Sequence, residues 1–144
     1  MNHNKKGFTL IELLVVIAII GLLSTIAVIS LNNARAKSRD ARRLSDVKQM
    51  QTALELYFAN NNLYPPDSAL DCGNSWKSGG ITYMGQVPCA PEPPDGTCSD
   101  ANNSYNYIQQ DGGESYSISY CLGAETNRII AGLHTATPAG IADP

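Results

Sequence analysis

A long apolar segment stands near the start of the chain. Between Phe8 and Leu31, 18 of the 24 residues are hydrophobic, and no proline interrupts them. As a helix, this segment would be about 36 Å long, which exceeds the roughly 30 Å hydrocarbon thickness of a bilayer. The pattern therefore predicts a transmembrane helix. Glu12 is its single charge, and a carboxylate inside such a helix normally requires a cationic partner. A position near the membrane interface, from which the side chain reaches water, is the alternative.

The pattern becomes amphipathic after the apolar segment. Residues 32–60 contain no proline or glycine and are rich in helix-forming residues. One face is marked at spacings of three and four by Leu44, Val47, Gln51, Leu54 and Phe58. Three asparagines at 60–62 end the pattern. We expect one helix from Phe8 to about Asn60, with a membrane-embedded half at 8–31 and an amphipathic half at 32–61. Its stripe is expected to pack on the rest of the chain, with a partner helix as the alternative.

Residues 62–144 have the pattern of a small antiparallel sheet with long loops. Prolines and glycines predict that the segment 64–101 is mostly loop. Alternation in Tyr105–Gln110 and Ser115–Leu122, with glycines at the turn between them, predicts a hairpin. Arg128–Ala131 is a candidate third strand, and the tail after Gly132 has no recognisable pattern. The fold class is therefore α+β, with one long helix packed against a small antiparallel sheet.

Aromatic side chains are expected to supply much of the core of this sheet domain. Tyr116, Ile118 and Tyr120 lie on one face of the predicted hairpin and are expected to be buried rather than to form a ligand surface. Trp76, Tyr83, Met84 and Val87 are expected to cover part of the helix stripe.

Cysteine usage points to an oxidising compartment. Hydrophobic residues make up 43% of the chain, and because so many lie in the apolar segment, the remainder has a modest supply for a core. Small domains of this kind often need covalent staples. Four cysteines follow the long helix, at Cys72, Cys89, Cys98 and Cys121. They match no zinc-binding spacing and allow three disulfide pairings. We favour Cys72–Cys89 with Cys98–Cys121, because each bond closes a modest loop.

Charge divides sharply along the chain, although the whole chain has a formal net charge of −3. Residues 35–48 have a net charge of +4, whereas residues 67–144 have a net charge of −7. The two regions are expected to complement each other between neighbouring copies. Solvation of both regions and contact of the basic run with lipid headgroups remain alternatives. The overall acidity and the lack of interleaved aromatic residues give no reason to expect a nucleic-acid partner.

The residues needed for catalysis are sparse. The chain has two histidines, His3 and His134, and His134 is expected to lie on the surface near the tail. No nucleophile motif or phosphate-binding glycine loop is present in the sequence. The sequence therefore does not predict an enzyme.

The residues around the start of the apolar segment resemble those of a known family. Lys5-Lys6-Gly7-Phe8-Thr9-Leu10-Ile11-Glu12 is similar to the prepilin signature of type IV pilins and type II secretion pseudopilins. The resemblance implies that residues 1–7 form a basic leader and that a prepilin peptidase cuts between Gly7 and Phe8. It also implies N-methylation of Phe8, and pairing of Glu12 with the Phe8 amine of a neighbouring subunit. Ile29 stands where many relatives have a proline, so the helix break of those relatives is not expected here.

The same resemblance implies a filament subunit with a type IV pilin-like fold. Such a subunit is anchored in the inner membrane with its head outside the cytoplasm. A separate ATPase and an inner-membrane platform then assemble it into an extracytoplasmic filament. Tyr64-Pro65 after the helix is similar to the major pseudopilin group and favours a role in protein secretion. A type IV pilus subunit for adhesion, motility or DNA uptake is the alternative, and a monomeric membrane-anchored binding module is a third possibility.

Three observations compete with this interpretation or qualify it. Ala34-Arg35-Ala36 fits the cleavage site of a secretory signal peptide, although the apolar segment is long for one. A plain uncleaved anchor is also compatible with the pattern. The positive charges at 35–48 would keep that flank in the cytoplasm by the positive-inside rule, which opposes the orientation that the cysteines and the resemblance imply.

Calcium is the one cofactor that the resemblance suggests, because major pseudopilins often bind it in the loop after the sheet. Asp95, Asp100 and Asp111 offer suitable oxygen ligands. They do not form a dense acidic cluster in the sequence, and Leu122–Asn127 is only faintly similar to that loop. We therefore expect no metal, and the disulfides are expected to fix the loops instead.

Overall fold

The computed structural model describes residues 7–142, so the basic part of the predicted leader, residues 1–6, lies outside the described residues. The chain divides into two compact units, Met1–Arg35 and Ala36–Pro144. Helix α1 runs over Leu10–Asn61 and contributes to both units. The helix expected from Phe8 to about Asn60 is therefore confirmed to within two residues at either end.

Helix α1 begins and ends with local capping. Helix α1 contains one glycine, Gly21, and a helix tolerates a single glycine at a cost of about 1 kcal/mol relative to alanine. At the other end, Asn62 adopts a left-handed backbone with φ of 57°. Its N–H donates to the carbonyl oxygen of Phe58 at 2.7 Å, which closes the last turn. The chain then turns back toward the sheet at Tyr64, whose N–H donates to the carbonyl oxygen of Gly113 at 2.8 Å.

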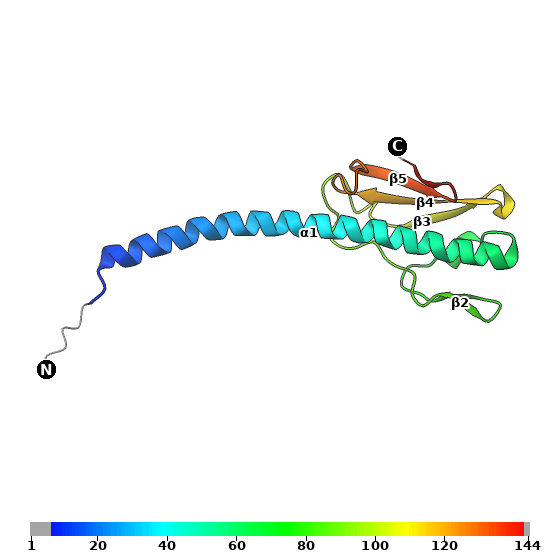
Figure 1. Ribbon diagram of the computed structural model, residues 1–144, viewed down its shortest axis with the longest axis horizontal. Helices are drawn as coiled ribbons and strands as arrows, with labels where there is room; N and C mark the ends of the chain where they lie inside the picture. Colours follow the sequence, from blue (N-terminus) through cyan, green and yellow to red (C-terminus); the bar gives the residue numbers. More distant parts are fainter. Residues whose placement is uncertain (1–6, 143–144) are drawn as a thin grey trace. The chain divides into compact units, whose positions relative to one another are not determined.

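The second unit is built on a four-stranded antiparallel sheet in the order β3-β4-β5-β6. Its strands are Asn106–Gln110 (β3), Ser115–Leu122 (β4), Gly132–Thr137 (β5) and Gly140–Ala142 (β6). The short helix η2 joins β3 to β4 over Asp111–Gly113. Figure 1 shows β3, β4 and β5 alongside the second half of α1. The predicted hairpin is confirmed.

The predicted third strand at Arg128–Ala131 is wrong, because the third and fourth strands lie further along the chain. Strand β5 pairs with β4 from Leu122 opposite Gly132 to Ile118 opposite Ala136. Its buried positions are His134 and Ala136, so the alternation that identifies strands has no strongly apolar residue on its inner face. That weak pattern is the reason why the tail offered no signal.

A second, two-stranded sheet lies within the segment predicted to be mostly loop. Strand β1 (Trp76–Ser78) pairs with β2 (Ile81–Met84), and the short helix η1 covers Asp67–Ala69. Gly79 and Gly80 make the tight connection with φ of 56° and 80°, as a two-residue hairpin turn with left-handed backbone requires. The hairpin places Trp76 and Tyr83 against Tyr57 of α1, at ring-centroid separations of 5.4 and 5.1 Å. The expectation that these side chains cover the helix stripe is confirmed.

The core lies between the second half of α1 and the inner face of the sheet. Helix α1 contributes Leu44, Val47, Met50, Ala53 and Leu54. The sheet contributes Tyr107, Tyr116, Ile118, Tyr120, Leu122 and Ala136. Tyr116, Ile118 and Tyr120 are fully buried, so the tyrosines belong to the core as expected. The stripe on α1 packs within its own chain.

Two disulfides fix the long segment before β3, and they have the favoured pairing. Cys72 is bonded to Cys89, and Cys98 is bonded to Cys121. The second bond ties the loop before β3 to the end of β4. Beside it, Gly96 and Gly123 approach so closely that a side chain at Gly96 would collide with the carbonyl group of Gly123.

His134 does not lie on the surface as expected, because it is 1% exposed on the inner face of β5. Its Nε2 lies 2.8 Å from the carbonyl oxygen of Ile130, and its ring lies 5.6 Å from that of Tyr120. The period-two alternation of β5 turns it inward together with Ala136. A single polar residue in a weak pattern gives no indication of this burial.

Candidate functional site

The first turn of α1 forms the candidate processing and assembly site. Gly7, Phe8 and Thr9 precede the helix, and Phe8 is 85% exposed. The carbonyl oxygen of Thr9 accepts a hydrogen bond from the N–H of Leu13, as an N-cap residue does. The site therefore consists of a short non-helical segment followed at once by a capped helix.

Glu12 closes a reciprocal capping box with Thr9. The backbone N–H and the side-chain hydroxyl of Thr9 both donate to Glu12 Oε2 at 2.8 Å. The N–H of Glu12 in turn donates to the Thr9 hydroxyl at 3.3 Å. The Thr-x-x-Glu spacing is the sequence signature of this arrangement, and our sequence analysis missed the role of Thr9 although that signal is present. Among residues 7–142, Glu12 thus has hydrogen-bond donors but no cationic partner.

The helix that follows exposes apolar side chains on every side. Sixteen large hydrophobic side chains between Phe8 and Leu31 are 47–85% exposed. By length and composition, α1 is the one helix in residues 7–142 that is apolar enough to cross a membrane, with a mean hydropathy of 2.8 over its best window. Soluble proteins rarely expose contiguous apolar surface of this size, so the segment needs lipid or other protein around it.

The second half of α1 begins with charged residues that the sheet domain covers. Asp40 and Arg43 are 0% and 1% exposed, and Arg43 Nη1 donates to Asp40 Oδ1 at 2.8 Å. Arg39 Nε donates to Asp95 Oδ2 at 2.6 Å, and Arg43 also reaches this carboxylate at 3.3 Å. The hydrogen bonds from Arg39, followed by those from Arg43, hold the pKa of the Asp95 carboxyl below its usual value although burial opposes them. We call these four residues, Arg39, Asp40, Arg43 and Asp95, the charge cluster.

The charge cluster fixes two loops to α1. Asp40 accepts hydrogen bonds from the backbone N–H groups of Gly123 at 2.9 Å and Ala124 at 3.0 Å. Arg43 Nη2 donates to the carbonyl oxygen of Pro91 and to Asn103 Oδ1, both at 3.0 Å. The loop after β4 and the loop before β3 therefore both depend on charged groups of the helix.

This arrangement changes the expectation about charge complementarity. Part of the basic run at 35–48 is compensated within its own chain, because Arg39 and Arg43 pair with Asp95 and Asp40. These pairs could not be predicted from the helix periodicity, because a hydrophobic pattern takes no account of charged residues that face inward. Only the remaining basic side chains are available for contacts with other molecules.

The three calcium candidates are not brought together. Asp95 is bound to two guanidinium groups, Asp100 follows the Cys98 disulfide, and Asp111 lies in the turn between β3 and β4. Among residues 7–142, no group of three or more His, Cys, Asp or Glu side chains is arranged to hold a metal ion. Asp95 in particular serves as the partner of two cations.

Comparisons with known proteins find similar sequences that include the first helical turns. Residues 2–28 match the family described as the prokaryotic N-terminal methylation motif. The chain is 38% identical over 93 residues to the type II secretion system core protein G of Aeromonas hydrophila, covering 64% of the chain and 58% of the relative. It is 49% identical over 55 residues to the type IV major fimbrial protein FimA of Dichelobacter nodosus, covering 38% of the chain and 35% of that protein.

The family match lies in the N-terminal part of the chain, and each relative matches only part of it. Against the type II secretion system core protein G of Escherichia coli K12, identity is 38% over 64 residues, which is 44% of either protein. The chain thus spans between 35% and 58% of the length of these relatives. No solved structure matches the chain. The prepilin-type motif expected from the sequence is confirmed, and so is the resemblance to both groups of relatives.

Proposed function

We propose that this chain is a structural subunit of a helical filament of the pseudopilus type, which acts in protein secretion. The observation that carries the proposal is the first half of α1, where sixteen large apolar side chains are exposed around a helix that starts with one carboxylate. A bundle of such helices from many copies would bury this surface after the subunits leave the bilayer. The relatives named type II secretion system core protein G and type IV fimbrial protein support an assembling role.

Processing creates the cation that Glu12 requires. Cleavage between Gly7 and Phe8 by a prepilin peptidase gives Phe8 a free α-amine with a pKa of about 7.7–8.0, which is largely cationic at neutral pH. The amine of one subunit then pairs with Glu12 of its neighbour and fixes the axial register. Methylation of the Phe8 amine retains its charge. The capping box with Thr9 keeps the carboxylate hydrogen-bonded until that neighbour arrives.

The proposed filament also requires a membrane and an assembly machine. The subunit starts in the inner membrane with its leader in the cytoplasm and the disulfide-bonded head on the other side. An inner-membrane platform and a separate ATPase supply the site and the work of extraction.

The match to the Aeromonas hydrophila relative extends over 93 residues and so beyond the helix, which supports the secretion role. The higher identity to the fimbrial protein, 49% over 55 residues, keeps a type IV pilus as the second candidate.

The test begins with the intact mass and N-terminal sequence of the protein extracted from membranes. A chain that starts at Phe8 and is heavier by one methyl group is expected. A start at Lys37 would identify a secreted domain, and an intact leader would identify a plain anchor; either result contradicts the proposal. A deletion strain then separates the two filament types, because loss of exoprotein secretion is expected and loss of motility or DNA uptake alone would favour a pilus.

A further inference from the structure

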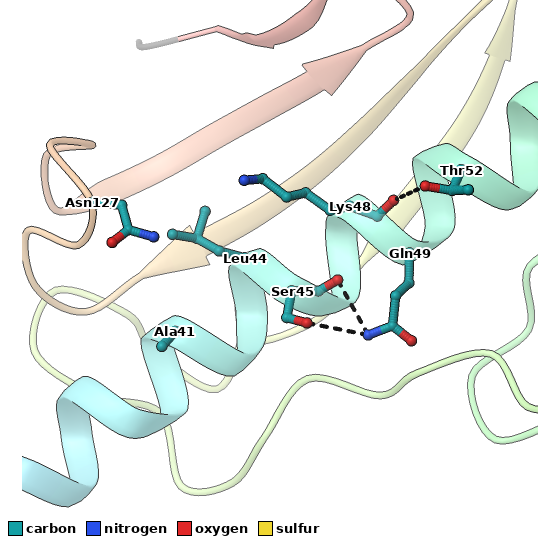
Figure 2. A pocket seen from close by; sticks show the side chains of 7 residues that line it. All are labelled: Ala41, Leu44, Ser45, Lys48, Gln49, Thr52 and Asn127. Atoms are coloured by element: carbon teal, nitrogen blue, oxygen red, sulfur yellow. Dashed lines mark hydrogen bonds between the residues drawn. The ribbon is translucent and has the colours of Figure 1, made fainter.

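One face of the second half of α1 is left uncovered by the sheet domain. A shallow groove of about 320 Å³ runs along it, lined by Ala41, Leu44, Ser45, Lys48 and Thr52 of α1 and by Asn127 of the loop between β4 and β5. Figure 2 shows Leu44 and Lys48 on the side toward Asn127, with Ser45 and Gln49 on the other side. Ala41, Ser45 and Thr52 are small, so another backbone can approach closely here. We call this surface the α1 groove.

Two lysines lie along the face of the α1 groove: Lys48 lines the groove, and Lys37 lies about one turn before Ala41. Lys37 and Lys48 are eleven residues apart, which is about three helical turns, so they lie on the same face roughly 16 Å apart. Both side chains are exposed, and neither forms an ion pair with any of residues 7–142. Arg39 and Arg43 differ from them, because those two guanidinium groups are directed into the charge cluster. The basic run thus contains inward-facing guanidinium groups at Arg39 and Arg43 and outward-facing ammonium groups at Lys37 and Lys48 that have no ion pair among residues 7–142.

The opposite charge is presented by the turn between β3 and β4. Asp111 and Glu114 are exposed there and have no cationic partner among the described residues. The turn is held in place, because Gly113 is buried and its carbonyl oxygen accepts from the N–H of Tyr64 at 2.8 Å. A side chain at Gly113 would press on Leu63 and Gln109. We call residues 111–114 the acidic turn.

We propose that the acidic turn of one copy docks into the α1 groove of a second copy, between Lys37 and Lys48. The two carboxylates match the two ammonium groups in number and sign, and the small residues of the groove admit a turn that itself contains two glycines. The occupant is a second copy because both halves of the contact are on this chain. This inference rests on the proposed function, since it assigns a contact within the filament.

The contact has a direction. The groove and the turn are different surfaces, so each copy can offer its groove to one neighbour and its turn to another, and such a heterologous contact can propagate into an open filament. Within one copy, the acidic turn is hydrogen-bonded to Tyr64, which follows the end of α1, and that end at Asn61 is thirteen residues and thus about 20 Å along the helix from Lys48. Docking therefore displaces successive copies along the helix direction by a distance of that order. Charge complementarity of this kind mainly fixes register and excludes wrong neighbours.

Zero-length crosslinking of filaments tests the contact directly. Filaments are sheared from cells that express the full-length chain in ¹⁴N and ¹⁵N forms, mixed during assembly, and are treated with a carbodiimide. We expect mixed-isotope peptides that join Lys37 or Lys48 to Asp111 or Glu114.

Charge reversal is the second test. The double variants Lys37→Glu/Lys48→Glu and Asp111→Lys/Glu114→Lys are each expected to lower filament yield by at least about tenfold, because like charges then meet. Combining all four substitutions is expected to restore the yield.

The controls separate failure of this inference from failure of the proposed function. Lys77→Glu, an exposed lysine on β1, is expected to leave the yield unchanged. Both disulfides and near-ultraviolet circular dichroism confirm that each variant is folded. If the unaltered protein forms filaments that lack mixed-isotope crosslinks, or if the fourfold variant is not rescued, the inference is overturned while the filament stands. If the lysine variant assembles normally but binds anionic vesicles less, the lysines contact lipid phosphate and the inference is also overturned. If the unaltered protein forms no filament, the proposed function fails.

Discussion

The two halves of α1 are one continuous helix but differ in which side chains they expose and which they bury. The first half exposes apolar side chains and has one carboxylate without a cationic partner among residues 7–142. The second half buries charged side chains that pair with each other and with Asp95 of the sheet domain. Both arrangements would be unfavourable if each half stood alone, because exposed apolar surface and unpaired buried charge both cost free energy. The partner of the second half is therefore encoded within the chain, and the partner of the first half is another molecule.

The contrast between the two halves of α1 would be lost if Glu12 were not needed for assembly. We expect Glu12→Leu to reduce filament yield by about a hundredfold or more, because the neighbour's amine would be buried without its carboxylate. Cleavage between Gly7 and Phe8 and folding of the head are expected to stay intact. Sheared-filament yield and N-terminal sequencing measure both effects. Ser24→Leu is the matched control, and equal loss in both variants would show that any polar-to-leucine change in this half has the same effect.

The charge cluster of the second half is tested by Arg43→Met. This substitution leaves Asp40 and Asp95 with fewer donors in a buried site, and breaking a buried pair costs about 3–5 kcal/mol. We expect the free energy of unfolding, measured on the full chain in detergent micelles by urea titration, to fall by that amount. Arg42 is largely exposed and lies 3.8 Å from Asp46, so Arg42→Met is expected to cost about 1 kcal/mol or less. Equal costs for the two substitutions would mean that the cluster is solvated.

The periodic parts of the chain could be predicted from sequence, and the parts that depend on inward-facing polar groups could not. The buried face of α1 could be predicted from the spacing of Leu44, Val47 and Leu54, because apolar spacing is a local signal. Arg43 and Asp40 lie on the same buried side, but their partners Asp95 and Gly123 are more than fifty residues away. Strand β5 was missed for a similar reason, since its inner residues are His134 and Ala136. The Thr9–Glu12 capping box was local and could have been found.

The same substitution in the two halves sharpens the comparison. Leu54 is 0% exposed in the core, so Leu54→Ala is expected to lower the free energy of unfolding of the head by about 2–5 kcal/mol. Leu22 is 64% exposed in the first half, so Leu22→Ala is expected to leave this free energy unchanged. The micelle urea titration compares the two variants. A comparable loss for Leu22→Ala would show that the first half already has a partner within the chain.

The smallest expected effect distinguishes two carboxyl groups of the second half by their pH dependence. Hydrogen bonds from Arg39 lower the pKa of Asp95, whereas burial raises the pKa of Asp46 although Tyr105 donates to it at 3.0 Å. A group with a lowered folded pKa contributes stability above its unfolded pKa, near 4, and loses it as pH falls through the folded value. A group with a raised folded pKa contributes below its unfolded pKa and loses that contribution as pH rises through the folded value.

The two asparagine variants should therefore diverge in opposite directions. The stability of the unaltered protein relative to Asp95→Asn is expected to grow as pH rises from about 3 to 6, by an amount on the order of 1 kcal/mol. Relative to Asp46→Asn, it is expected to shrink over the interval just above pH 4. Urea titrations at matched ionic strength measure both differences. Parallel curves for the two variants would mean that Arg42 and Tyr105 hold Asp46 in its charged form, despite its burial, as firmly as Arg39 holds Asp95. The inward-facing charges of α1 would then form one compensated set rather than two.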